Sequence, residues 1–301
     1  MCSSCRPSRA RKPRRSSARR CRKTPTAWWI WRRAPMPETV RGIHYRVDDI
    51  RAPWAGEALP VLFNHGIGTT HDIWAGWVPA IAARRPMLRF DMRGFGRSVM
   101  PPVDHVWSMD ELIADLWSVA DAAGAGRVHL MGESMGGTIV LAAALARPER
   151  VASVSISNAS YKGKGIGELA YWRDQFAAGG PAGWSGRMMG NRFNPGHGDP
   201  AALDWFQQEQ ARTQPHVALG LGGVLAASDL TEPLRAAPFP LSVVLPDSSP
   251  FVPPLHGAEL REIVSDCRLR VVPGVRHGLP FSHAAEEAAQ LAAWLDAVDA
   301  A

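Results

Sequence analysis

Residues 132–136 have the sequence Gly-Glu-Ser-Met-Gly, and their types and spacing suit a nucleophilic serine. An apolar run precedes them at 128–131, and a helix-like run follows from Thr138 to Ala146. In a G-x-S-x-G turn between a strand and a helix, small residues allow the sharp bend that exposes the serine hydroxyl. The first N–H groups of the helix point toward the group under attack. We therefore predict that Ser134 is a nucleophile.

A histidine at the other end of the chain has the position expected of a general base. A serine hydroxyl attacks well only when a base takes its proton, and an acceptor must fix the tautomer of that base. In proteins with such a turn, the three residues follow one another along the chain in the order serine, acid, histidine. His277 lies in the loop 273–278, between the last strand-like run and the last helix-like run. His277 is the predicted base.

Two backbone N–H groups must stabilise the oxyanion that forms when a serine attacks a carbonyl. One is the N–H of Met135 at the start of the helix, and the other is expected in the loop after an earlier strand. The segment His65-Gly-Ile-Gly follows the strand-like run 61–64, so we assign the second donor to Ile67. An ordinary strand-ending turn is the alternative for this segment. A zinc site at His65 and His71 would lack a third ligand nearby.

The elements that must position these groups alternate between strand-like and helix-like runs from Val40 onward. This alternation predicts an α/β fold with a mostly parallel sheet and helices on both faces. The alternation stops after Ser157, where a segment rich in Gly, Pro and aromatic residues begins. We expect a core over 36–158, an inserted helical cap over 159–228, and the rest of the core over 229–301.

Three motifs in the expected order resemble those of the α/β-hydrolase superfamily over residues 38–301. They are the His65-Gly-Ile-Gly loop, the glycine-rich turn at 132–137, and Asp91-Met-Arg-Gly-Phe-Gly-Arg-Ser, which matches a D-x-R-G-x-G-x-S loop. The resemblance implies the α/β-hydrolase fold, a Ser134–acid–His277 triad, an oxyanion hole and no cofactor.

The acid is the point at which the chain departs from its relatives. Ser249 occupies the place where similar chains usually have the acid, directly before Pro250. The nearest carboxylate is Asp247, directly after the strand-like run 241–245, and it is the candidate triad acid. The alternatives are that His277 is oriented by Ser249, by a backbone carbonyl, or by Asn158 at the end of another strand.

The resemblance implies acyl transfer to water, because Ser134 stands where dehalogenases and epoxide hydrolases need a carboxylate. The chain is most similar to 3-oxoadipate enol-lactonases and related small ester or lactone hydrolases, so a small, largely hydrophobic ester or lactone is the expected substrate. Carbon–carbon bond hydrolases of the same fold are an alternative, although they often have an aromatic residue where Gly278 stands. A non-catalytic, pocket-bearing binder with a degraded triad is another.

Composition limits the partners of the folded part. The first 33 residues contain 12 of the 34 Lys and Arg and no acidic residue, so the remainder has a net charge of −6. A basic tail alone does not make the folded body a nucleic-acid binder. No apolar run is long enough to span a bilayer, and only Cys267 lies outside the tail. We expect a cytoplasmic enzyme without a metal or membrane partner. The sequence leaves open whether the protein forms a homo-oligomer.

The segment 1–35 is expected to be a disordered basic extension, because it is rich in Arg and Ser and has no periodicity. It has three interpretations: a targeting peptide with too short an apolar region, an arm that binds RNA or membranes, or upstream sequence translated from a misplaced start before Met36. Its Cys2-x-x-Cys5 pair lacks a second pair at zinc-finger spacing.

Overall fold

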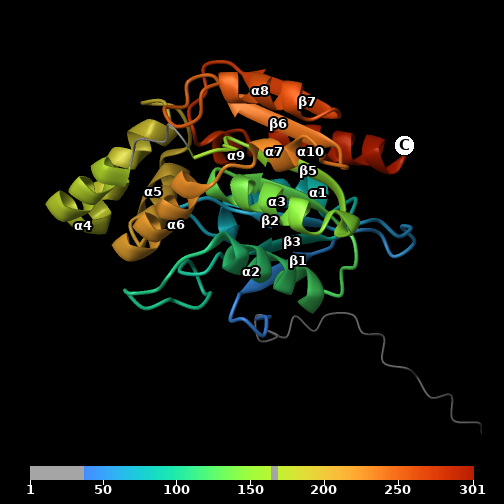
Figure 1. The fold of residues 1–301 in the computed structure, drawn as a ribbon, viewed down its shortest axis with the longest axis horizontal. Coiled ribbons are helices and arrows are strands. Elements are labelled where there is room, and N and C mark those ends of the chain that lie inside the picture. The colour runs from blue at the N-terminus through green and yellow to red at the C-terminus, as the bar shows by residue number, and fades with distance from the viewer. Residues whose placement is uncertain (1–36, 164–168) are drawn as a thin grey trace, which may run out of the picture. The chain divides into compact units, whose positions relative to one another are not determined.

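The computed structural model of the chain describes residues 37–163 and 169–301. The expected basic extension, residues 1–35, lies outside the described residues. Figure 1 shows a central sheet between layers of helices, with a group of helices at one end of the sheet.

Seven strands form one sheet in the order β1-β3-β2-β4-β5-β6-β7. Strand β1 pairs antiparallel with β3, and every other pair is parallel. The predicted α/β class with a mostly parallel sheet is therefore confirmed. The bounds of the strands are Tyr45–Asp48 (β1), Val61–Asn64 (β2), Met87–Phe90 (β3), Val128–Glu133 (β4), Val151–Ser157 (β5), Leu241–Pro246 (β6) and Cys267–Val272 (β7).

Helices cover both faces of the sheet, each over its own apolar cluster. One cluster lies beneath helices α2 (Met109–Ala122), α3 (Met135–Ala146) and α8 (Leu255–Ile263). The other lies beneath η1 (His71–Trp77), α1 (Val78–Ile81) and α10 (Ala284–Asp299). Three further short helices are η2 (Pro148–Arg150), α7 (Thr231–Leu234) and α9 (Leu279–Ser282). None of the helices within the described ranges is long and apolar enough to cross a membrane.

Local signals explain where several helices begin. Ser108 precedes α2 and its side chain accepts a hydrogen bond from the N–H of Glu111 at 3.2 Å, as a capping box predicts. The residue pattern of 72–84 predicts one helix, but the structure has the 3-10 helix η1 followed by the short α1. Pro79 lies in the first turn of α1, where its missing N–H needs no partner. The sequence interpretation assigned no element to α8.

Three of the four described helices between β5 and β6 form the insertion: α4 (Leu169–Arg192), α5 (Pro200–Gln210) and α6 (Pro215–Ala227). We call them the inserted helices. They lie together at one end of the sheet (Figure 1), α4 contacts the other two, and α6 also contacts α3. Helix α4 is broken at Gly180, which has a φ of 61° and is followed by a proline. They fall within the interval 159–228 expected for a cap.

Candidate active site

Ser134 lies at a strained turn between β4 and α3. Its φ of 53° and ψ of −126° fall outside the regions that residues with a side chain favour. Gly136 meets the backbone of the loop after β2 so closely that a Cβ would overlap the carbonyl oxygen of His65. A Cβ at Gly132 would overlap the carbonyl oxygen of Gly136 in the same way. The glycines of the motif are therefore required by close backbone approach, and the turn aims the serine side chain away from the sheet.

The hydroxyl of Ser134 meets the imidazole of His277. Its Oγ lies 3.0 Å from Nε2 of the histidine, although the two residues are 143 positions apart in the sequence. His277 comes from the loop between β7 and α9, and its residue is only 2% exposed. Burial and the positive charge of Arg192 hold the pKa of His277 well below its usual value of 6.5. The histidine is therefore neutral near pH 7, as a general base must be.

Backbone and side-chain contacts fix the position of His277. The Nδ2 of Asn158 donates a hydrogen bond to the carbonyl oxygen of His277, and the N–H of His277 donates to the carbonyl oxygen of Asn191 at 3.3 Å. Asn158 has a φ of 55°, a conformation that asparagine tolerates better than most residues. The neighbouring N–H of Gly278 donates to the carbonyl oxygen of Arg192 at 2.8 Å. The base is thus held between the end of β5 and the end of α4.

The other imidazole nitrogen contacts a serine. Oγ of Ser249 lies 3.0 Å from Nδ1 of His277. The same oxygen accepts longer hydrogen bonds from the N–H groups of Phe251 at 3.3 Å and Val252 at 3.4 Å. A hydroxyl has one proton and two lone pairs, so the tautomer of His277 decides whether Ser249 accepts from Nδ1 or donates to it. In the tautomer with the proton on Nδ1, Ser249 accepts and Nε2 has a lone pair facing Ser134.

Asp247, the candidate acid, is not brought to His277. It is exposed at the end of β6, where its N–H donates to the carbonyl oxygen of Val272. Its Oδ1 accepts a hydrogen bond from the N–H of Gly274 at 2.7 Å and another from the hydroxyl of Ser248 at 2.8 Å. The sheet register thus fixes Asp247 before the loop turns inward, and the residue two positions later reaches the imidazole. Asp247 instead ties the loop after β6 to the loop that contains His277.

Ile67, in the loop after β2, lines the same pocket as Ser134, and Met135 is the first residue of α3. Neither residue's N–H donates a hydrogen bond to another group within 37–163 and 169–301. His65 anchors the loop: its Nε2 accepts from the N–H of Met92 at 2.9 Å, and its Nδ1 lies 2.8 Å from the carbonyl oxygen of Gly66. Burial lowers the pKa of His65 to about 4, which favours the neutral ring that these bonds need.

Glu133 supports the same loop from the residue before the serine. Its Oε1 accepts a hydrogen bond from the N–H of Gly66 at 2.8 Å. Its residue is 2% exposed, and burial raises its pKa. The carboxyl group lies behind the turn, so it positions the loop that contains Ile67.

Ser134 and His277 line a small pocket beneath the inserted helices. Its free volume is about 40 Å³, enough for a few water molecules. The wall is largely apolar and comes from α4, α6 and the loop after β6, including Trp172, Met188, Leu225, Phe251 and Val252. An organic substrate can enter only if some of these side chains move.

Arg192, at the end of α4, also lines this pocket, and the sequence interpretation missed it. The residue is 4% exposed. Its Nε donates to Oε1 of Gln210 at 2.7 Å, its Nη2 donates to the carbonyl oxygen of Ile67 at 2.6 Å, and its guanidinium lies 5.4 Å from the ring centre of Phe206. An arginine within an aromatic stretch was the only signal in the sequence, and such residues usually reach water.

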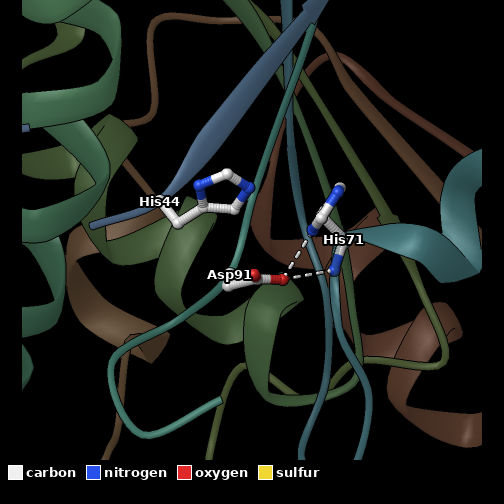
Figure 2. Close-up of side chains that lie close together, drawn as sticks. All are labelled: His44, His71 and Asp91. Atoms are coloured by element: carbon white, nitrogen blue, oxygen red, sulfur yellow. Dashed lines mark hydrogen bonds and ion pairs between the residues drawn. The ribbon is translucent and has the colours of Figure 1, made fainter. Parts of the chain in front are cut away.

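A second group of buried polar side chains, His44, His71 and Asp91, lies at the edge of the sheet near the start of η1 (Figure 2). Their potential ligand atoms lie within 4.8 Å of one another, so they are the described residues that could hold a cation. Asp91 is already fully bonded: Oδ1 accepts from the N–H of His71 at 2.9 Å and lies 2.7 Å from its Nδ1, and Oδ2 accepts from the N–H of Arg97 at 3.0 Å. Although burial opposes ionisation, the bonds and charge of His71 lower the pKa of Asp91 to about 2.

These contacts give the Asp91 motif an architectural explanation. Asp91 ties the loop after β3 to the loop after β2, and Ser98 extends the connection by donating to the carbonyl oxygen of Asp91 and accepting from the N–H of His44 at 2.9 Å. His65, which the sequence considered as a zinc ligand together with His71, is bonded to Met92 and Gly66 instead. The group lies apart from the lining of the Ser134 pocket.

Comparisons with known proteins agree with this geometry. Residues 60–284 match a family described as alpha/beta hydrolase fold. A protein named carbamate hydrolase RutD, from Caulobacter segnis, is 36% identical over 120 residues, which are 40% of this chain and 44% of that protein. The 2-hydroxymuconate semialdehyde hydrolase of a Pseudomonas species is 36% identical over 100 residues, 32% of this chain and 35% of the relative. The matched segments thus span less than half of these relatives.

Solved structures match over a longer part of the chain. An enol-lactonase from Burkholderia xenovorans has a TM-score of 0.77 and 21% identity, and the match covers 84% of this chain and 96% of that one. At this identity the likeness shows the shared fold alone.

Proposed function

Because the chain belongs to the α/β-hydrolase family, we propose that it is a serine hydrolase that cleaves a small carboxylic ester or lactone through an acyl-enzyme. The observation that supports this most strongly is the 3.0 Å contact between Ser134 Oγ and His277 Nε2 at the strained turn. A neutral, buried histidine beside an otherwise unreactive hydroxyl is the arrangement that activates a serine. The contact also lies at the wall of a pocket.

The proposed reaction begins when Ser134 Oγ bonds to the substrate carbonyl carbon and gives its proton to Nε2 of His277. The carbonyl electrons move to oxygen, and the N–H groups of Ile67 and Met135 stabilise the resulting oxyanion. When the C=O bond re-forms, the bond to the alcohol oxygen breaks and that oxygen takes the proton from His277. Water then attacks the acyl-enzyme by the same steps and releases the acid. With a lactone, both groups stay in one product.

In this proposal Ser249 is the third member of the catalytic group. Its Oγ accepts a hydrogen bond from the protonated Nδ1 of His277, which leaves Nε2 unprotonated and able to act as the base. A hydroxyl can accept this hydrogen bond as a carboxylate would, but it can also donate, and it brings no negative charge to the imidazolium that forms during attack. Asp247 has a supporting role in the loop.

The inserted helices act as a cap in this proposal. Trp172, Met188 and Leu225 of these helices contribute to the largely apolar pocket wall, which favours a small substrate with a hydrophobic part. A free volume of about 40 Å³ requires that the cap shifts as the substrate enters.

The names of two relatives suggest other bonds for the same serine: a carbamate and a carbon–carbon bond. Gly278 argues against the latter, since relatives that resemble carbon–carbon hydrolases often have an aromatic residue there. A Cβ at this position would overlap the ring of Phe193. An ester or lactone is therefore the substrate class that we place first.

A fluorophosphonate probe tests the nucleophile directly. We expect stoichiometric labelling of the wild-type protein, seen as a mass shift, and no labelling of Ser134→Ala. The wild-type protein should also hydrolyse at least one member of a panel of 4-nitrophenyl esters, lactones, carbamates and vinylogous diketones. An unlabelled, inactive wild-type protein with a native circular dichroism spectrum would instead support a non-catalytic binder.

A further inference from the structure

The guanidinium of Arg192 is a buried cation that lacks an ionic partner in the free protein. Its hydrogen bonds go to two neutral oxygens, from Gln210 and from the backbone of Ile67. Among the described residues no carboxylate oxygen lies within 4.0 Å of it, the distance that defines the observed ion pairs. Arginines in proteins are rarely buried without a counter-charge, because desolvation of the charge is costly.

One nitrogen of this guanidinium has no hydrogen-bond partner among the described residues. The protein accepts hydrogen bonds from Nε and Nη2, whereas Nη1 has no such partner in the described part of the chain. Nη1 is also not among the buried nitrogen atoms that lack a partner, so it has accessible surface. The cation and the serine share one cavity, since Arg192, Ser134 and His277 all line it.

His277 lacks a nearby negative charge that would stabilise its protonated form. The group at its Nδ1 is the neutral hydroxyl of Ser249, so no negative charge balances the imidazolium during attack. The charged group that acts on His277 is Arg192, which disfavours protonation of the ring. Glu133 is the carboxyl group that acts on Arg192, but its Oε1 accepts from the N–H of Gly66 and it forms no ion pair with Arg192. Within the described residues, no carboxylate therefore contacts Arg192 or the imidazole of His277 when the base must accept a proton.

We propose that the substrate has an anionic group, such as a carboxylate, that binds Arg192 and supplies the negative charge that the Ser134–His277–Ser249 group lacks. This inference rests on the proposed hydrolase function and specifies its substrate class. Bound to Nη1, the anion offsets the charge of the guanidinium, so the imidazolium forms at lower cost. An anionic ester then has two advantages over a neutral one: it binds Arg192, and its charge makes protonation of His277 easier. Arg192 is therefore the residue that determines specificity.

A matched pair of substrates tests this proposal. The mono-4-nitrophenyl esters of glutaric, adipic and pimelic acid have a terminal carboxylate, and the corresponding terminal amides are neutral and nearly isosteric. We expect kcat/KM of the wild-type protein to be at least about tenfold higher for the carboxylate in one of the three lengths, as a charge-assisted hydrogen bond provides. Arg192→Gln should bring the ratio close to one. Arg187→Gln, on the exposed side of α4, is the control that should keep the preference.

A second variant leaves Arg192 in place, so its result does not depend on whether the Arg192→Gln protein folds. Ser249→Asp supplies the missing negative charge from the protein, so it should raise kcat/KM for the neutral amides by about tenfold and narrow the preference. Equal wild-type rates for both members of every pair, or an unchanged preference in Ser249→Asp, would overturn the inference while leaving the hydrolase function intact. Hydrolysis of no substrate and no labelling by the fluorophosphonate would reject the proposed function itself.

Discussion

Oγ of Ser249 lies 3.0 Å from Nδ1 of His277, whereas the carboxylate of Asp247, two residues earlier, accepts from the N–H of Gly274. Ser249 therefore occupies the position next to the imidazole that a triad acid would take, and Asp247 contacts the backbone of the loop instead. In the proposed reaction Ser249 accepts from Nδ1 of the imidazole, whereas Asp247 joins the loop after β6 to the loop that contains His277. This difference gives opposite expectations for substitutions only two positions apart.

Ser249→Ala removes the acceptor for Nδ1 and leaves a buried N–H without a partner. We expect kcat to fall on the order of 10²-fold, because the correct tautomer is no longer favoured. Rates with 4-nitrophenyl acetate, normalised to the fraction labelled by a fluorophosphonate, give the measurement.

Asp247→Asn is the matched comparison, because the amide oxygen can still accept the hydrogen bond from Gly274. Its rate should stay within about threefold of the wild-type rate, as for most exposed substitutions. A loss on the order of 10⁴-fold in this variant would instead identify Asp247 as the triad acid.

The pH dependence of kcat/KM follows from the lowered pKa of His277. The base acts only when it is neutral, and its charged form appears only below its pKa. Activity toward a neutral ester should therefore persist as the pH falls through 6.5, the usual value, and decline only at lower pH.

Ser249→Asp should move this acidic decline upward by about one to three pH units, because a nearby carboxylate favours the imidazolium. Profiles between pH 4 and 8 with 4-nitrophenyl acetate compare the two proteins. A wild-type midpoint above 6.5 would contradict the environment described for His277.

The meeting of Ser134 and His277 could be predicted because the signals for both residues are local. Ser134 is fixed by glycines that allow one sharp turn, and His277 is fixed by its place between the last strand and the last helix. The sheet follows from the same alternation of apolar runs. These features depend on short segments, so one sequence is enough to find them.

Ser249 and Arg192 depend instead on contacts between distant segments. The sequence favoured Asp247 because it is the nearest carboxylate, but the register of β6 against β7 decides which residue reaches His277. Arg192 looked like an ordinary charged residue of the expected cap, and only the packing of α4 on Ile67 and Gln210 places it in the pocket.

Gly278 offers a steric test of how α4 meets the base. A Cβ there would lie 2.8 Å from the carbonyl oxygen of Arg192 and would overlap the ring of Phe193. Its φ of −80° is open to any residue, so the effect of Gly278→Ala is purely one of space. We expect a loss of about 1–3 kcal/mol in the free energy of unfolding, measured by urea denaturation, and a lower kcat because His277 is the adjacent residue.

Gly190→Ala, within α4, is the control for this substitution. Nothing lies within 4 Å of a Cβ at position 190, so the variant should be as stable as the wild type or slightly more stable, as alanine favours a helix over glycine. If Gly278→Ala matched this control in both stability and kcat, the end of α4 would not pack against the loop of His277 as described. An aromatic residue at 278 would then fit, and the steric argument against carbon–carbon bond hydrolysis would fail with it.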